Sequence, residues 1–226
     1  MLDGQRRVLD FFIIPLAGLL RHVNPNVLTV SSLLMSLPAA WLLWRSSPAT
    51  EATDYFLVFA SLCIIVHGVL DLLDGVVARR YNKATPIGDF LDHVFDRVAD
   101  VLLLTALSMS DWGDPYIGLV AIAATLLTSY LGTQAQAVGA GRLYAGFVGR
   151  ADRLVLLMAA PLADHILVVF DITLDFFPGA PAYVLGYVLW YIALGGIITS
   201  VQRFLKILAN LRKRRREAQA PEPGES

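Results

Sequence analysis

Cysteine and charged residues are scarce in this chain of 226 residues. Cys63 is the only cysteine, so no disulfide can form within the chain, and we expect its thiol to pack inside an apolar span rather than to serve redox chemistry. Charged residues make up 16% of the chain, hydrophobic residues make up 56%, and the mean hydropathy is +0.60. This composition excludes an ordinary soluble domain and predicts a polytopic membrane protein. The N-terminus lacks the small-residue cleavage site of a secretory signal, and we expect no nucleic-acid partner.

Six apolar stretches are long enough to cross a bilayer. Each has about 20 predominantly apolar residues, which matches a hydrocarbon core about 30 Å thick. The stretches cover residues 26–44, 54–79, 90–109, 115–137, 153–170 and 182–205. The predicted fold class is therefore an all-α polytopic membrane protein with six transmembrane helices. Residues 1–210 form its single membrane-embedded domain, and residues 211–226 form a basic and then disordered cytoplasmic tail.

Residues 4–22 differ from these six stretches because basic side chains interrupt their apolar residues. That mixture predicts an amphipathic helix lying in the cytoplasmic interface of the membrane. A short seventh span is the alternative, and the length of the segment and its central Pro15 argue against it.

The distribution of basic residues predicts the orientation in the membrane. Most Lys and Arg residues fall in segments 1–25, 80–89, 138–153 and 203–226, whereas the other loops are acidic or neutral. By the positive-inside rule, both termini and the active site lie on the cytoplasmic side of the cell membrane.

Four aspartates lie within or next to the second and third apolar stretches. Asp71 and Asp74 are three residues apart, and Asp92 and Asp96 are four apart, so each pair shares one face of a helix. A lone charged Asp at the centre of a bilayer costs about 2.5–3.5 kcal/mol, so clustered acids imply cations that hold them there. Two antiparallel helices would bring the pairs together into an all-oxygen site, which suits Mg²⁺ or Mn²⁺ and is a poor zinc site.

A structural alternative is that basic residues near the helix ends pair with these acids as interfacial salt bridges. The candidates are Arg79, Arg80, Lys83 and Arg97. Asp89 lies nearer the loop and would cap a helix, whereas Asp100 continues the acidic face one turn past Asp96 and would pair with a base or orient a ligand. Acids within helices also occur in cation or proton transporters, which remain an alternative of a different class.

The acids belong to a longer pattern that fixes eight residues within 26 positions. These residues are Asp71, Asp74, Gly75, Ala78, Arg79, Gly88, Asp92 and Asp96. The pattern resembles the complete signature of the CDP-alcohol phosphotransferase family. Residues 128–139 and 149–153 are most similar to archaeal members such as archaetidylinositol phosphate synthases. The predicted arrangement of six spans after an interfacial helix also matches the family.

The resemblance implies transfer of a substituted phosphate from a CDP-linked lipid, CDP-archaeol or CDP-diacylglycerol, to a polar alcohol, with release of CMP. It implies two Mg²⁺ or Mn²⁺ ions on Asp71, Asp74, Asp92 and Asp96, with Asp96 also acting as general base, and it implies a homodimer among membrane lipids. The residues that it implies for the CDP donor are Asn26, Thr29, Asp71, Gly75, Ala78, Arg79 and Gly88. Helix capping, close helix packing and snorkelling remain alternative roles for the members of this set that are not acids.

An arginine-rich segment suggests the acceptor. Gly149-Arg150-Ala151-Asp152-Arg153 resembles a segment of inositol phosphate-using members of the family. The expected acceptor-binding residues are Arg142, Arg150, Arg153 and Arg203. Guanidinium groups suit a phosphate, which favours inositol phosphate, although the positive-inside rule also places arginines here. Neutral glutamines replace a basic run of these relatives at residues 133–136, so glycerol phosphate, serine and other alcohols stay open as acceptors.

Overall fold

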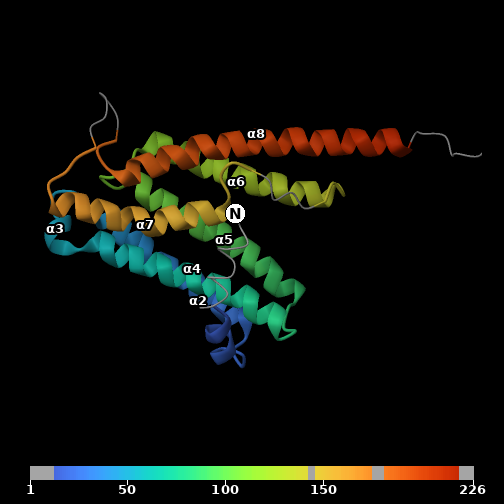
Figure 1. Ribbon diagram of the computed structural model, residues 1–226, viewed down its shortest axis with the longest axis horizontal. Helices are drawn as coiled ribbons and strands as arrows, with labels where there is room; N and C mark the ends of the chain where they lie inside the picture. Colours follow the sequence, from blue (N-terminus) through green and yellow to red (C-terminus); the bar gives the residue numbers. More distant parts are fainter. Residues whose placement is uncertain (1–12, 142–145, 175–180, 219–226) are drawn as a thin grey trace, which may run out of the picture.

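The computed structural model describes residues 13–141, 146–174 and 181–218, and helices with short connections make up this part of the chain. The helices α2 (Pro25–Arg45), α4 (Phe56–Arg80), α5 (Pro86–Ser108), α6 (Pro115–Ala137), α7 (Arg150–Val169) and α8 (Val184–Ala218) form a bundle, and α3 (Glu51–Asp54) is a single turn between α2 and α4 (Figure 1). Residues 13–19 are also helical. No strand occurs among the described residues, so the predicted all-α class is confirmed.

Three of the long helices begin with the same local device. The side chains of Asn24, Thr85 and Asp114 accept hydrogen bonds from backbone amides of the first turn, and each is followed by a proline at the first helical position. A side-chain cap satisfies an amide that has no partner within the helix, and proline has no amide to satisfy there. The caps of α2 and α5 lie at the same end of the bundle as the acidic residues, so they also position the candidate site.

The first turn of α8 has a cap from another helix. Asp164 of α7 is fully buried, and its two carboxylate oxygens accept hydrogen bonds from the amides of Val184 and Leu185, each at 2.7 Å. A buried carboxylate needs such donors. The contact fixes α7 beside α8 at the end of the bundle away from the candidate site.

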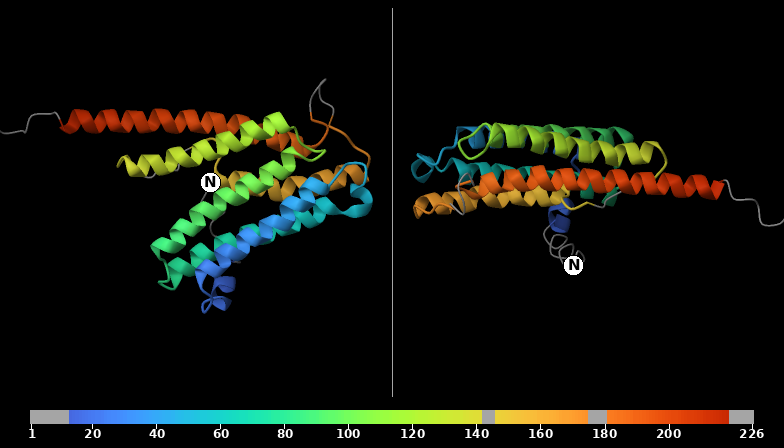
Figure 2. Two further views of the ribbon diagram at one scale, coloured as in Figure 1. Left: turned by 180° about the vertical axis from the view of Figure 1, so that it is seen from behind. Right: turned by 90° about the horizontal axis from the view of Figure 1, so that it is seen from above.

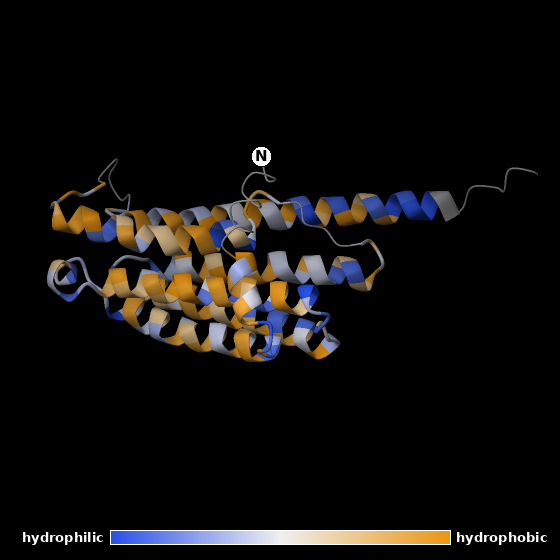
Figure 3. Cartoon of the chain, turned by 60° about the horizontal axis from the view of Figure 1, so that its bottom comes forward, coloured by the Kyte–Doolittle hydropathy of each residue, from blue (hydrophilic) through white to orange (hydrophobic). Residues whose placement is uncertain are grey.

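Large aliphatic side chains fill the core between the helices. Leu43 of α2, Ile64 of α4, Leu107 of α5, Leu157 of α7 and Leu189 of α8 are almost completely buried in one cluster. Outward-facing apolar side chains are also numerous, and most of the helical ribbon within the bundle has the orange of hydrophobic residues (Figure 3). An outer surface of this kind suits hydrocarbon rather than water.

Four helices of the described chain, α2, α4, α6 and α8, are long and apolar enough to cross a membrane. The positions of the other two expected spans are occupied by α5 and α7, so all six predicted segments are helical. Every 18-residue stretch of these two helices contains at least three charged residues, whereas each of the other four has an 18-residue stretch with at most one. The charged residues in the most apolar stretches are Asp92, Asp96, Arg97 and Asp100 in α5 and Asp152, Arg153 and Asp164 in α7. Several of these charged residues belong to the candidate site, so the lower hydropathy of α5 and α7 is a consequence of the residues that they contribute to it.

The two ends of the chain bear on the remaining predictions. Residues 4–12 of the expected interfacial helix lie outside the described residues, but Ile13 and Ala17 of the following turns are buried against Leu28, Leu73 and Val77. At the other end, the basic residues 212–216 belong to α8, which extends beyond the bundle as a hydrophilic helix (Figures 2 and 3).

Candidate active site

Three of the four predicted acids form a compact group. Asp71 and Asp74 come from the last turns of α4 and Asp92 from the beginning of α5, and one carboxylate oxygen of each lies within 4.8 Å of the other two. Asp74 is only 3% exposed, and its Oδ2 atom is buried without a hydrogen-bond partner among the described residues. A buried unpaired carboxylate oxygen is costly unless a cation binds it. The group therefore fits a hard divalent ion, which prefers oxygen ligands.

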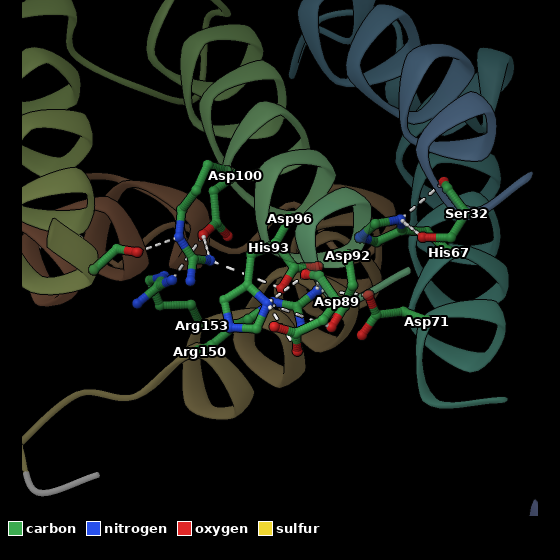
Figure 4. Close-up of polar contacts among 12 residues, drawn as sticks. Ser32, His67, Asp71, Asp89, Asp92, His93, Asp96, Asp100, Arg150 and Arg153 are labelled. Atoms are coloured by element: carbon green, nitrogen blue, oxygen red, sulfur yellow. Dashed lines mark hydrogen bonds and ion pairs between the residues drawn. The ribbon is translucent and has the colours of Figure 1, made fainter. Parts of the chain in front are cut away.

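Asp96 lies one turn further along α5, outside that group of three, and it is 8% exposed. The Nη2 atom of Arg150 is 2.7 Å from Asp71 Oδ1 and also contacts Asp96 Oδ1 (Figure 4). The helix α7 thus supplies a guanidinium group to acids on α4 and α5. The structure brings all four predicted acids to one end of the bundle but places Asp96 next to an arginine.

A cavity of about 280 Å³ adjoins the three-acid group. Of the seven residues expected to bind a CDP donor, all except Asp71 line it, and Asp74 and Asp92 complete its acidic side. The six are Asn26, Thr29, Gly75, Ala78, Arg79 and Gly88. The donor-binding residues implied by the sequence pattern are thus consistent with one shared cavity between α2, α4 and α5.

Two glycines keep this cavity open. A Cβ atom on Gly88 would lie 2.9 Å from Asn26 Oδ1, and a Cβ atom on Gly75 would lie 3.1 Å from the guanidinium nitrogens of Arg79. Both separations are shorter than ordinary contacts of a methyl group with nitrogen or oxygen. A larger residue at either position would displace a lining side chain of the cavity.

The cavity also has lining residues that sequence reasoning did not assign to the site, among them Lys83 and Thr85 of the connection between α4 and α5. Lys83 Nζ donates hydrogen bonds to the carbonyl oxygens of Arg21 and Val23 at 2.6 and 3.1 Å. The only signal in the sequence for Lys83 and Thr85 was their position between Arg79 and Gly88 of the motif. The contacts of Lys83 could not be predicted, because they join segments about 60 residues apart.

The predicted arginines gather on the other side of Asp96. Arg153 is 6% exposed, and its Nη2 atom donates a hydrogen bond to Asp100 Oδ2 at 2.8 Å. Arg97, which was not among the expected acceptor residues, has its Nη1 atom 3.6 Å from the same oxygen. Asp100 therefore pairs with bases, as one of its two sequence-based interpretations stated.

Two guanidinium nitrogens in this group lack hydrogen-bond partners. Arg153 Nε and Arg97 Nη1 are both buried and unbonded within the described residues, whereas Arg97 Nε donates to Ser129 Oγ. Arg203 Nη1 donates to the carbonyl oxygen of Thr128 at 2.7 Å, and its charge acts on Arg97 and Arg153. Arg142 lies outside the described residues. Buried donors of this kind suit an anion such as a phosphate.

The family pattern for CDP-alcohol phosphatidyltransferases matches residues 22–199. This chain belongs to the CDP-alcohol phosphatidyltransferase family. It is accordingly a metal-dependent transferase of a membrane, and the transporter alternative is set aside.

Relatives of this CDP-alcohol phosphatidyltransferase cover most of its length. The archaetidylinositol phosphate synthase of Methanothermobacter thermautotrophicus is 28% identical over 167 residues, which are 74% of this chain and 80% of that protein. The phosphatidylinositol phosphate synthase of Mycobacterium bovis is 30% identical over 195 residues, which are 82% of this chain and 80% of that protein.

Solved structures of phosphatidylinositol phosphate synthase from Mycobacterium tuberculosis share the fold. The form with CDP-DAG bound gives a TM-score of 0.65 at 24% identity and covers 87% of this chain and 93% of that one. The complex with manganese and citrate gives a TM-score of 0.64 at 25% identity, covering 87% and 89% of the two chains. The second of these structures contains manganese, one of the two metals predicted from the acids of this transferase.

Proposed function

We propose that this enzyme transfers a substituted phosphate from a CDP-linked lipid to inositol phosphate and releases CMP. One observation carries the proposal, namely that α5 separates an acid-lined cavity from an arginine group while contributing to both. Asp92 lines the cavity, whereas Arg97 and Asp100 belong to the arginine group, and Asp96 lies between them in the helix. A donor diphosphate and an acceptor phosphate could therefore approach Asp96 from opposite sides.

The donor side rests on the cavity and the acids beside it. Asp71, Asp74 and Asp92 would hold one divalent ion, and Asp96 with Asp71 would contribute to a second. When bound, such ions supply positive charge to the diphosphate and to the departing CMP. Gly75, Ala78 and Gly88 leave room for the nucleotide, and Arg79 reaches the same cavity with a group suited to phosphate oxygens.

Asp96 is placed to act on the acceptor hydroxyl. Its Oδ1 atom contacts Arg150, and its Oδ2 atom lies 3.9 Å from Arg97 Nη1. The two guanidinium groups fix the position of this carboxylate, which can accept the hydroxyl proton as the new bond to phosphorus forms. This role follows the family resemblance and gives Asp96 a function distinct from that of the three grouped acids.

The acceptor side favours a phosphorylated alcohol over an uncharged one. Arg97, Arg153 and Arg203 influence one another electrostatically, and two of their nitrogens are buried without a hydrogen-bond partner. Serine would leave these two nitrogens without a hydrogen-bond acceptor, whereas the phosphate of inositol phosphate would accept from them. Inositol phosphate is preferred to glycerol phosphate because the relatives named above are archaetidylinositol phosphate and phosphatidylinositol phosphate synthases.

We further propose that α5 and α7 complete a set of six spans and that the enzyme works as a homodimer. The acid and arginine groups then face the cytoplasm, at the end of the bundle from which α8 extends as a basic helix (Figure 1). The donor is CDP-archaeol or CDP-diacylglycerol, since a shared site for the CDP diphosphate does not depend on the lipid chains.

An acceptor screen tests the function. Purified enzyme with Mg²⁺ or Mn²⁺ would receive CDP-archaeol or CDP-diacylglycerol together with inositol phosphate, glycerol phosphate, serine or inositol, and both CMP and the lipid product would be measured. We expect CMP and a phosphoinositol lipid in equal amounts only with inositol phosphate. A product with serine or free inositol instead would refute the phosphate-binding role of the arginines, and CMP release with none of the acceptors would refute the transfer itself.

A further inference from the structure

Arg150 holds two of the candidate metal ligands with a single nitrogen atom. Its Nη2 is 2.7 Å from Asp71 Oδ1 and also contacts Asp96 Oδ1, so it bridges carboxylates of α4 and α5 (Figure 4). Both aspartate side chains are 9% exposed, and that of Arg150 is 30% exposed. A cation between two carboxylates removes their mutual repulsion, which is the task that a bridging divalent ion performs in a metal site.

The start of α7 makes this position of Arg150 specific. Arg150 is the first residue of the helix, after Gly149, whose amide donates to Asp152 Oδ2 at 2.8 Å. The next arginine of the same helix, Arg153, is bound to Asp100 and lies away from the two metal ligands. Two arginines one turn apart therefore have separate carboxylate partners.

We infer that Arg150 is an internal counter-ion that competes with a second divalent cation for Asp71 and Asp96. The inference rests on the proposed function, because it assumes that these acids bind metal. Arg150 forms no ion pair with Asp74 or Asp92 among the described residues, and it contacts Asp71 only through Oδ1. Asp71 Oδ2, Asp74 and Asp92 can therefore bind a first ion while Arg150 stays in place. The second ion needs the oxygen atoms that Arg150 holds, so this ion binds only as the guanidinium group moves away.

The competition also links metal binding to the acceptor side. The charges of Arg150 and Arg153 both act on Arg97, so a displaced Arg150 remains near the other arginines. There it would add a positive charge for an acceptor phosphate. By thermodynamic linkage, any anion that draws Arg150 away must strengthen the binding of the second ion by the same factor as that ion strengthens the binding of the anion.

Manganese titration of the full-length enzyme in detergent, followed by electron paramagnetic resonance, tests the competition without substrate. Wild-type enzyme should bind a tight ion and a weaker one per chain. In Arg150→Gln the weaker ion should bind about tenfold more tightly, because it no longer has to displace a guanidinium group from two largely buried carboxylates, and the tight ion should change by less than about threefold. Arg153→Gln is the matched control, since it removes the same charge one turn away and should change neither ion by more than about threefold.

Melting temperatures with and without Mn²⁺ give a second measurement, which also detects any loss of stability in the variant. Arg150→Gln should melt at a lower temperature than wild type without metal and should gain more from added Mn²⁺, because the ion then relieves the repulsion between Asp71 and Asp96. If Arg150→Gln cannot be purified in a folded form, Arg150→Lys, which keeps the charge but loses the rigid guanidinium plane, should show an intermediate affinity for the weaker ion.

The outcomes separate the inference from the proposed function. Equal second-ion affinities in wild type and Arg150→Gln, or an equal effect of Arg153→Gln, would overturn the competition even if CMP release is normal. A wild-type enzyme that binds no Mn²⁺, or that binds it unchanged in Asp74→Asn, would overturn the metal site itself and the competition with it.

Discussion

Arg153 of α7 donates its Nη2 hydrogen to Asp100 Oδ2 of α5 at 2.8 Å, and this pair joins the two helices that contribute to the arginine group. The bond uses one donor of Arg153 and leaves Nε, which is buried, for another partner. An arginine fixed by one carboxylate with a donor to spare is well suited to bind an anion.

Replacing Arg153 with Gln should therefore raise the KM for inositol phosphate by about 10- to 100-fold, since a hydrogen bond to a charged group contributes about 1.5–3 kcal/mol. The KM for the CDP donor should stay nearly constant. Initial rates with each substrate varied in turn measure both constants.

Asp100→Asn provides the control for this prediction. It weakens the same ion pair but keeps the guanidinium group, so its effect on the acceptor KM should be clearly smaller than that of Arg153→Gln. Equal effects of the two variants would mean that Arg153 only holds α5 and α7 together.

The acidic group allows a sharper test of metal dependence. Replacing Asp71, Asp74, Asp92 or Asp96 with Asn removes a negative ligand, so each variant should release CMP at least about 100-fold more slowly. Chelation of divalent ions with EDTA should stop the wild-type reaction, and added Mg²⁺ or Mn²⁺ should restore it. Asp111→Asn, an exposed change at the opposite end of the bundle, should have wild-type activity. Near-normal turnover in any of the four variants would remove that residue from the site.

The sequence was most informative about groups that lie close together along one helix. Asp71 and Asp74, or Asp92 and Asp96, share a face because helical geometry fixes their spacing. The capping assignments were wrong, because Asn24 rather than Asn26 or Thr29 caps α2, and Thr85 rather than Asp89 caps α5. The approach of the end of α4 to the start of α5 could also be expected, because the connection between them is short. Beyond it, the two helices pack mainly against α2 rather than against each other.

Contacts between distant segments could not be predicted in the same way. Arg150 was expected to bind the acceptor, and its pairing with Asp71 across 79 residues depends on how α7 packs against α4. Arg97 was not among the expected acceptor-binding residues, although its buried Nη1 atom belongs to the arginine group. Periodicity shows the face that a side chain occupies, but only tertiary packing shows which charge lies opposite.

Adding a single methyl group at Gly88 should disturb the cavity beside the acids. In Gly88→Ala the new Cβ atom would lie 2.9 Å from Asn26 Oδ1, so it would push a lining side chain into the donor cavity. The KM for the CDP donor should increase by about tenfold while the acceptor KM changes little. Alanine favours a helix more than glycine does, so a lower melting temperature is not expected.

Gly18→Ala is the matched control, because its Cβ atom would meet only Tyr81 Oη at the ordinary distance of 3.9 Å. This variant should have both wild-type KM values. An unchanged donor KM in Gly88→Ala would show that the nucleotide does not occupy this part of the cavity.

A buried acid at the other end of the bundle predicts a dependence of stability on pH. Both carboxylate oxygens of Glu51 lie 3.0 Å from the amide nitrogen of Leu57, and His165 Nδ1 lies 3.0 Å from Oε1. Burial raises the pKa of Glu51 above its ordinary value, and the hydrogen bonds from Leu57 and His165 only partly oppose this effect. The contribution of Glu51 to stability is thus fully present below the ordinary pKa of glutamate, about 4.3, and is lost as the pH rises through the raised pKa.

Glu51→Gln should therefore gain stability relative to wild type as the pH increases from about 4 to about 8. Melting temperatures of the two proteins in detergent, measured across this range, would show the difference. Asp54→Asn serves as the control, because Asp54 is exposed and close to Glu51, and its difference from wild type should vary much less with pH. A Glu51→Gln variant that instead loses stability relative to wild type at higher pH would mean that His165 and the Leu57 amide stabilise the charged carboxylate more than burial opposes it.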